Sequence, residues 1–171
     1  MTGAPPATGF EHASDTPSGW TDPPPITSFK SVNILLRGAD GRTLLQMRDG
    51  AGAGALTWGF WGGGVEASDV SLADCAVREL GEELRLEALP QDFAFLSFRG
   101  RRAGHLAALL LYRRSVAWTE IDVREGAGAG FFWRSELLRI DVSQAVREHL
   151  MARPDLFADW ASRQPRPAPG E

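Results

Sequence analysis

Three glutamates, Glu79, Glu82 and Glu83, lie within five consecutive residues of the stretch Val-Arg-Glu-Leu-Gly-Glu-Glu-Leu. On a helix, residues three and four positions apart share a face, so Glu79 would lie beside both of the other carboxylates. Like charges at that spacing repel one another, more strongly when they are partly removed from water. A positive partner is therefore expected, either an arginine or a bound cation.

Ion pairs along a solvated helix are the first explanation. Arg78 stands four residues after Asp74 and four before Glu82, and Arg85 follows Glu82 by three. Pairs at these spacings are common on exposed helices. In that case the segment is a salt-bridged surface helix of a mixed α/β domain with no metal chemistry.

A divalent cation is the second explanation. Mg²⁺ prefers carboxylate oxygens and keeps several of its waters, which suits a partly open helix face. The preceding segment 58–66, WGFWGGGVE, places glycines where backbone can approach a metal or a phosphate closely. A glycine-rich loop that leads into an acidic amphipathic helix favours the metal site.

The helix that carries the carboxylates is predicted over residues 71–84. Ser71 is a suitable N-cap, and Asp74 three residues later resembles the second half of a capping box. An apolar stripe follows at helical spacing, and the three glutamates are expected roughly opposite to it; the stripe comprises Ala73, Val77, Leu80 and Leu84.

Short apolar runs predict the strands that position this helix. Residues 31–37 and 43–48 form a hairpin around the Asp40-Gly41 turn, and residues 93–98 and 105–114 form a second antiparallel pair. A further strand ends in Gly-Phe-Phe-Trp at Trp133, and residues 143–151 form a closing helix. Interleaved helices and strands predict an α/β fold with a mixed sheet.

Composition limits the class of protein. The 171 residues suit one domain, predicted over residues 28–162, between a flexible arm (1–27) and a flexible tail (163–171) that are rich in proline and other small residues. The net charge of −4 argues against a nucleic-acid partner. Cys75 is the only cysteine, and no stretch is apolar enough for a secretory signal or a membrane span. A cytoplasmic location without membrane contact is expected.

From Gly63 onward the sequence resembles the signature of the Nudix hydrolases: glycine, five residues, glutamate, seven residues, Arg-Glu-hydrophobic, one residue, Glu-Glu, one residue, glycine, hydrophobic. Here Gly63 is followed after five residues by Asp69, then by Arg-Glu-Leu-Gly-Glu-Glu (78–83), Arg85 and Leu86. The flanking segments 44–49 (LLQMRD) and 124–133 (REGAGAGFFW) and a strand that opens at His105 are similar to the family as well.

Four departures from the signature concern the loop and the end of the helix. Asp69 replaces the first glutamate, and eight residues rather than seven separate it from Arg78. A start at Gly64 restores the spacing but puts Val70 at the glutamate position. Arg85 replaces the closing glycine, so no left-handed helix cap is expected there. The acidic face is unchanged.

The resemblance implies an α/β/α sandwich that hydrolyses a nucleoside diphosphate linked to another moiety, with Mg²⁺ or Mn²⁺ as cofactor. By the same resemblance the metal ligands are Glu79, Glu82 and Glu83, with the Gly63 carbonyl as a further ligand. The metal would activate a water and neutralise charge on the pyrophosphate, and a carboxylate would take the proton. Arg78 would orient Glu79 or pair with Asp69.

A later carboxylate is expected in the loop before the last strand. Glu125 is the candidate, both as a metal ligand and as a catalytic group, with Glu120 and Asp122 as alternatives.

Substrate contacts are predicted for four residues, each with a structural alternative. Trp58 and Phe60 would stack on a base or anchor their loop, and Arg99 would bind phosphate or lie in a solvated turn with Arg101 and Arg102. His105 would meet substrate at the sheet edge or close a strand. Two other residues are interpreted as structural, Cys75 and His149.

Several alternatives stay open at this level. Asp69, the extra residue and Arg85 favour a non-catalytic ligand-binding or regulatory domain of the same fold, whereas the intact Arg-Glu and Glu-Glu pairs favour the enzyme. The partner would be a small-molecule nucleotide derivative: a nucleotide sugar, a nucleoside triphosphate, ADP-ribose or a dinucleoside polyphosphate. A small homodimer is expected.

Overall fold

The computed structural model describes residues 25–50, 54–100 and 106–159. Most of the predicted N-terminal arm, the whole predicted C-terminal tail and His105 therefore lie outside the described residues. In the described part, no helix has the length and apolar character needed to cross a membrane.

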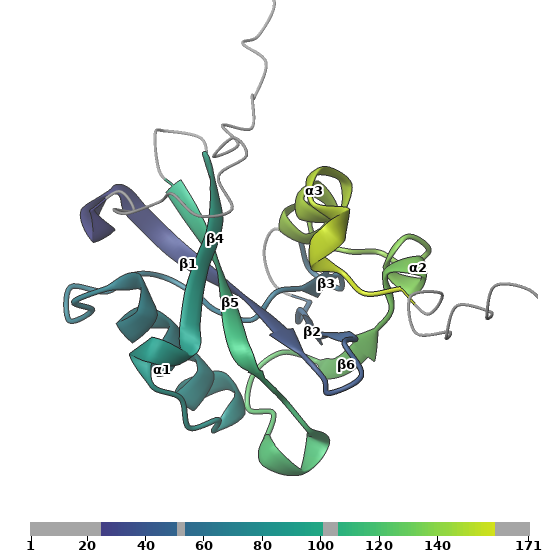
Figure 1. Cartoon of the computed structure of the whole chain (residues 1–171), viewed down its shortest axis with the longest axis horizontal. Coiled ribbons are helices and arrows are strands. Elements are labelled where there is room, and N and C mark those ends of the chain that lie inside the picture. Colours follow the sequence, from purple (N-terminus) through teal and green to yellow (C-terminus); the bar gives the residue numbers. More distant parts are fainter. Residues whose placement is uncertain (1–24, 51–53, 101–105, 160–171) are drawn as a thin grey trace, which may run out of the picture.

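Six strands form one mixed sheet (Figure 1) in the order β3-β2-β1-β5-β4, with β6 paired to β2. β1 and β5 are parallel, whereas the other paired strands are antiparallel. The predicted hairpin between β1 and β2 is confirmed, with Gly41 at φ +88° and its N–H bonded to the Gly38 carbonyl at 2.9 Å. The strands are β1 (Phe29–Arg37), β2 (Thr43–Met47), β3 (Trp58–Gly59), β4 (Phe93–Gly100), β5 (Leu106–Ser115) and β6 (Gly128–Phe132).

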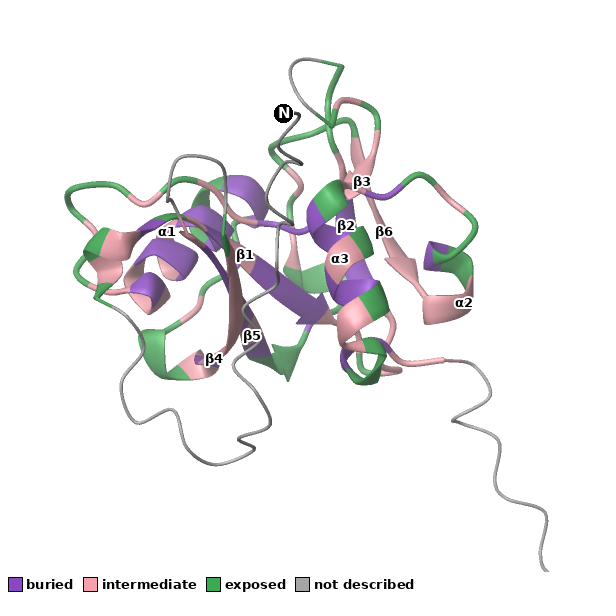
Figure 2. Ribbon diagram, turned by 90° about the horizontal axis from the view of Figure 1, so that it is seen from above, coloured by how far each residue is buried: buried purple, intermediate pink, exposed green. Residues whose placement is uncertain are grey.

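Helices cover both faces of the sheet (Figure 2). Alternating strand residues pack toward each layer. On β1, Ile34 and Leu36 pack toward α1 (Leu72–Leu84), whereas Leu35 packs toward α3 (Gln144–Ala152). The predicted α/β/α sandwich with a mixed sheet is confirmed. The pattern did not predict β3, α2 (Arg134–Leu137) or the 3₁₀ turns Ile26–Ser28, Pro90–Asp92, Trp118–Glu120 and Pro154–Leu156.

Both ends of α1 are capped. The Ser71 hydroxyl oxygen accepts a hydrogen bond from the Asp74 N–H at 3.1 Å and donates its own proton to the Asp74 carboxylate at 2.7 Å. At the other end Arg85 adopts φ +50° and ψ +27°, and its N–H donates to the Gly81 carbonyl. The expectation that Arg85 would prevent a left-handed cap is wrong. The turn directs Leu86 into the core, which offsets the roughly 1 kcal/mol that a side chain costs in this conformation.

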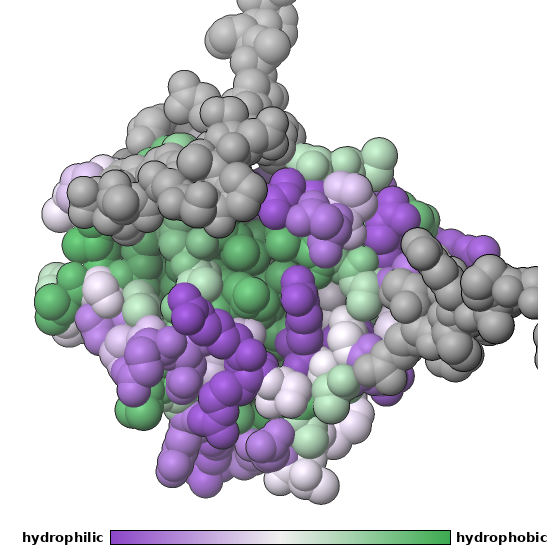
Figure 3. All heavy atoms as spheres, in the orientation of Figure 1, coloured by the Kyte–Doolittle hydropathy of each residue, from purple (hydrophilic) through white to green (hydrophobic). Residues whose placement is uncertain are grey.

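An apolar surface lies on the face that carries α1 and β4 (Figure 3). A cavity of about 350 Å³ lies there, lined by Ser71 and by apolar residues from the start of α1, from β4 and from the segment before β1. Its lining contains no charged side chain, which separates it from the site described next.

Candidate active site

Glu79 and Glu83 lie on the buried face of α1, with only 8% and 3% of their surface exposed, whereas the Glu82 side chain is 60% exposed. Leu72, Ala76, Glu79 and Glu83 follow one another at i, i+4, i+7 and i+11, so they share a line along the helix. The prediction that these glutamates stand opposite the apolar stripe is therefore wrong for two of the three. Ala73 and Val77, predicted in the stripe, are only partly buried.

The glycine-rich loop makes room for the two buried carboxylates. The Gly62 N–H donates to Glu83 Oε2 at 2.8 Å. A Cβ atom on Gly63 would lie 2.6 Å from both carboxylate oxygens of Glu79, so a side chain there would displace the carboxylate. The loop is fixed to β1, because Val32 N–H donates to the Gly63 carbonyl at 2.9 Å. One lone pair of that carbonyl, the predicted metal ligand, is thus already in use.

Arg78 joins the loop to the helix. Its Nη1 donates to Glu79 Oε1 at 2.9 Å and to Glu82 at 3.2 Å, and its Nη2 donates to the Gly64 carbonyl at 2.8 Å. Nε and Nη2 also bind the two carboxylate oxygens of Asp69, at 3.2 and 3.0 Å. Arg78 therefore both holds Glu79 and pairs with Asp69, the two arrangements that were predicted as alternatives.

Asp69 takes the place of the longer glutamate. The Arg78 hydrogen bonds hold the pKa of its carboxyl at about 2, so it is ionised at neutral pH. It also closes a turn by accepting the Glu66 N–H at 2.8 Å. Val70, one position further on, is 84% exposed. The extra residue is thus accommodated at the surface, away from the carboxylates.

The two buried carboxylates are incompletely neutralised. Burial raises the pKa of Glu83 to about 7, against the Gly62 hydrogen bond, and the charges of Glu125 and Glu79 raise it further. Burial also raises the pKa of Glu79, against its hydrogen bond from Arg78. A cation beside these groups would lower both pKa values, and an all-oxygen donor set suits Mg²⁺ or Mn²⁺. Among the described side chains, no three from His, Cys, Asp or Glu converge closely enough to enclose a metal ion.

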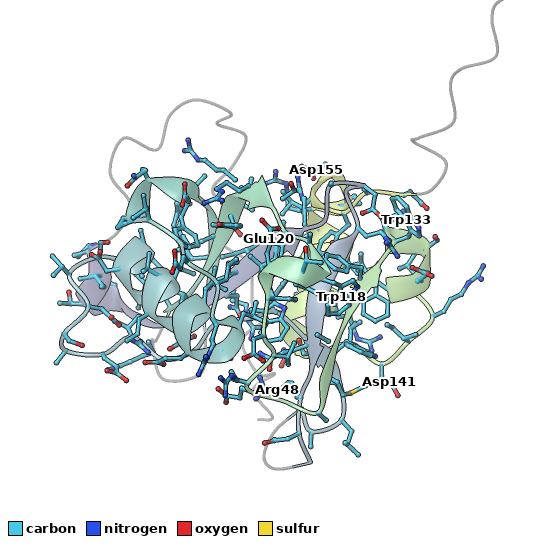
Figure 4. The ribbon with its side chains drawn as sticks, turned by 90° about the horizontal axis from the view of Figure 1, so that it is seen from below. Arg48, Trp118, Glu120, Trp133, Asp141 and Asp155 are labelled. Atoms are coloured by element: carbon cyan, nitrogen blue, oxygen red, sulfur yellow. The ribbon has the colours of Figure 1, made fainter. Side chains whose placement is uncertain are left out.

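A cavity of about 390 Å³ opens beside Glu83, and Glu125 lines it. The two alternatives to Glu125 are engaged elsewhere: Glu120 accepts the Ala117 N–H at 2.7 Å, and Asp122 binds Arg124 at 2.8 Å. Figure 4 shows Glu120 well away from Arg48, another residue of this cavity. Only Glu125, of the three, faces the cavity that Glu83 lines.

A second cavity of about 190 Å³ adjoins the first. Ser31, Asn33 and Arg48 line both, and the second extends to Arg99 on β4 and to Gln144 on α3. Neither Asn33, Gln46 nor Arg48 was predicted as a site residue. The sequence feature that could have indicated two of them is a polar residue within an apolar strand, Asn33 in β1 and Gln46 in β2.

The predicted substrate contacts fall in different places. Arg99 is ion-paired with Glu148 of α3 and lines the second cavity, so the solvated-turn alternative is wrong for it. Phe60 also lines that cavity, but its ring is buried against His149 and Phe157. The Trp58 ring lies 4.6 Å from that of Phe132, and Trp58 lines neither cavity.

Four further residues were named from the sequence. His105, Arg101 and Arg102 fall outside the described residues, so their predicted roles stay predictions. Cys75 is buried, and burial raises the pKa of its thiol to about 12, which leaves it protonated and unreactive. The interpretation of Cys75 as a packed core residue is confirmed.

Comparison with known proteins identifies the family. The NUDIX domain matches residues 27–133, more than half of the chain, so the protein belongs to the Nudix family. It is an enzyme of the Nudix hydrolase class. No curated protein sequence matches it.

Solved structures share the fold. The E. coli ORF135 protein is 27% identical, with a TM-score of 0.57 over 84% of this chain and 99% of its own. The MutT structure described for Aliivibrio salmonicida and Vibrio cholerae is 19% identical, with a TM-score of 0.61 over 72% and 94%. The NUDIX domain of Shewanella oneidensis NrtR, solved with ADP ribose, is 19% identical, with a TM-score of 0.56 over 75% and 88%.

Proposed function

We propose that the protein is a Mg²⁺- or Mn²⁺-dependent pyrophosphohydrolase that cleaves a nucleoside diphosphate linked to another moiety. Two observations carry this proposal: Glu79 and Glu83 are both buried, and Glu83 lines a cavity that Glu125 also lines. Arg78 offsets the charge of Glu79, and a divalent cation in the cavity would offset the charge that remains.

The carboxylates would bind the metal, and neighbouring groups would hold them in place. Glu83 and Glu125 would hold the metal together with several waters, and Glu79, Glu82 and the Gly63 carbonyl would be further ligands. When bound, the metal supplies an activated water and neutralises charge on the pyrophosphate. Arg78 holds Glu79 in place, and the Gly62 N–H does the same for Glu83.

Other groups would bind the substrate and move the proton. Glu125 would accept the proton of the attacking water, because it faces the cavity and its loop is anchored on both sides. Lys30 and Arg48 line the same cavity and would contact phosphate oxygens. Arg99, which lines the second cavity, would contact phosphate oxygens from there.

A nucleotide derivative is the proposed substrate class. The ADP ribose bound to the NrtR domain, and the ADP-ribose pyrophosphatase named among the structural neighbours, support it. The second cavity, which is lined by polar groups and by the edge of the core, would hold part of the nucleoside. The homodimer, the cytoplasmic location and the lack of a nucleic-acid partner stay predictions.

The non-catalytic alternative rested on the departures from the signature. Asp69 nevertheless makes a two-point contact with Arg78, and Arg85 adopts the left-handed conformation of a closing glycine. These departures therefore leave the carboxylates correctly supported, which favours the enzyme.

The test is a substrate panel with Mg²⁺ or Mn²⁺, scored for release of phosphate, pyrophosphate and nucleotide products. It covers nucleotide sugars, nucleoside triphosphates, ADP-ribose and dinucleoside polyphosphates. We expect turnover of at least one compound, lost in Glu83→Gln and retained in the control Glu87→Gln, which removes an exposed carboxylate just beyond α1. Glu82→Gln should lose less than Glu83→Gln because Glu82 is exposed. Binding of a nucleotide without turnover would favour the regulatory alternative.

A further inference from the structure

Gln46 is a buried polar side chain in an otherwise apolar strand. Its surface is 5% exposed, and its neighbours Leu44 and Leu45 on β2 belong to the two cores. It also lines the cavity beside Glu83. A buried amide at such a place has to be hydrogen-bonded to be tolerated, so its partners indicate its use.

The Gln46 amide nitrogen donates to two acceptors. One is the Phe60 carbonyl at 3.1 Å, and the other is Glu83 Oε1 at 3.4 Å, a long hydrogen bond. The other oxygen of Glu83 accepts the Gly62 N–H at 2.8 Å. Each carboxylate oxygen of Glu83 therefore has a donor, which fixes the plane of the carboxylate with respect to the cavity.

The opposite side of the Gln46 amide contacts the loop that carries Glu125. A Cβ atom on Gly126 would lie 3.1 Å from Gln46 Oε1 and 2.7 Å from the Met47 carbonyl, and Gly126 has φ +79°. The turn therefore rests directly on β2 at Gln46. One amide group thus touches both elements that present a carboxylate to the cavity.

We propose that Gln46 is a positioning residue that orients the Glu83 carboxylate and sets its place relative to Glu125. The inference rests on the proposed function, in which these carboxylates bind a divalent cation. In this role the residue acts through Glu83. Loss of such a supporting partner typically weakens metal binding by about 10- to 100-fold.

The test compares Gln46→Met with Thr43→Val in the full chain. Methionine keeps the length of the side chain but cannot donate to Glu83. Thr43 is a matched control on the same strand, since it is buried and its hydroxyl has no hydrogen-bond partner among the described residues. Mn²⁺ affinity is measured by titration calorimetry, and melting temperature is measured without metal.

We expect Gln46→Met to bind Mn²⁺ about 10- to 100-fold more weakly than the wild type, and Thr43→Val to bind it equally well. A purely structural Gln46 would lower the melting temperature of the variant and leave its Mn²⁺ affinity within twofold of the wild type. That result would overturn the proposal. Failure of the wild-type chain itself to bind Mn²⁺ would instead overturn the proposed function.

A measurement on the wild-type chain covers the case in which Gln46→Met does not fold. The side-chain amide of Gln46 gives a pair of NMR signals that report on its acceptors. On saturation with Mg²⁺ we expect both signals to shift, because the charge on Glu83 is then shared with the cation. Signals that stay unchanged while Mg²⁺ binds would show that Gln46 is not coupled to the site.

Discussion

Helices α1 and α3 flank the same sheet, and each buries ionisable side chains in its packed face. On α3, His149 is 4% exposed and both ring nitrogens have partners, the Ala145 carbonyl at 2.8 Å and the Ser97 hydroxyl at 3.1 Å. Burial lowers its pKa, which keeps the ring neutral. On α1, Glu79 and Glu83 are 8% and 3% exposed, but burial raises their pKa values and a cavity opens beside Glu83.

The difference separates a structural group from a functional one. A neutral imidazole with two partners needs nothing further, so His149 simply joins α3 to β4 and to the core. Glu79 is paired with one arginine, whereas Glu83 has only uncharged donors, so the two carboxylates keep an unbalanced charge that the fold maintains at a cost in stability. Perturbed groups of this kind that face a cavity are typical of functional sites.

The largest expected effect comes from Glu83→Gln. Mn²⁺ affinity should fall by more than about a hundredfold, beyond the loss caused by removing a mere supporting partner. The metal-free variant at pH 8 should be no less stable than the wild type, because the change removes a charge that burial disfavours. Calorimetric titration and metal-free thermal unfolding check the two parts. A large loss of metal-free stability would make Glu83 structural, as His149 is.

The corresponding experiment on α3 concerns pH. Because the folded pKa of His149 is lowered, the unfolded chain binds a proton more readily, and stability falls as the pH drops below about 6.5. One histidine can change the free energy of unfolding by at most about 1.4 kcal/mol per pH unit. Urea unfolding between pH 5 and 8 should show that pH dependence in the difference between the wild type and His149→Gln, because the opposite contribution of Glu83, whose pKa is raised to about 7, is the same in both proteins. The groups around the ring, Ser97, Arg99, Glu148 and Arg153, are the same in both proteins.

Metal binding provides the control for the histidine variant. At pH 8, folded His149→Gln should bind Mn²⁺ within twofold of the wild type, since the residue does not line the cavity beside Glu83. A strong loss of Mn²⁺ affinity would mean that His149 on α3 contributes to the metal site and is not purely structural.

The smallest expected effect is at the end of α1. Arg85→Gly removes a side chain from the left-handed region and should stabilise the fold by about 0.5–1 kcal/mol, partly offset by the greater entropy of glycine in the unfolded chain. Chemical denaturation measures the gain. A destabilised variant would indicate that the ion pair between Arg85 and Asp122, whose atoms lie 3.8 Å apart, contributes more to stability than exposed ion pairs usually do.

Local patterns predicted the elements well, and long-range contacts explain what they missed. The Ser71 cap and the Asp40-Gly41 turn depend on adjacent residues, so sequence was sufficient. The burial of Glu79 and Glu83 depends on the distant loop at Gly62 and Gly63, which makes room for carboxylates on a face that apolar periodicity would reserve for the core.

The same reasoning applies to the other residues of the site. Gln46 binds a carboxylate 37 positions away, and Arg99 pairs with Glu148, 49 positions away. Nothing near either residue in the sequence indicates its partner. The family resemblance pointed to Glu125 without distinguishing it from Glu120 and Asp122, whereas the fold separates the three by the direction in which each faces.

The turn around Glu125 is held at two main-chain points, Arg124 N–H on the Glu83 carbonyl and Ala127 N–H on the Met47 carbonyl, both at 2.8 Å. Its carboxylate is therefore held relative to both the helix and the sheet. Upstream of this turn, the Asp122 N–H also donates to the Leu84 carbonyl at 2.8 Å, and Val116 is buried in the core. An insertion or deletion between β5 and β6 would accordingly displace the acid unless the two hydrogen bonds of its turn were kept.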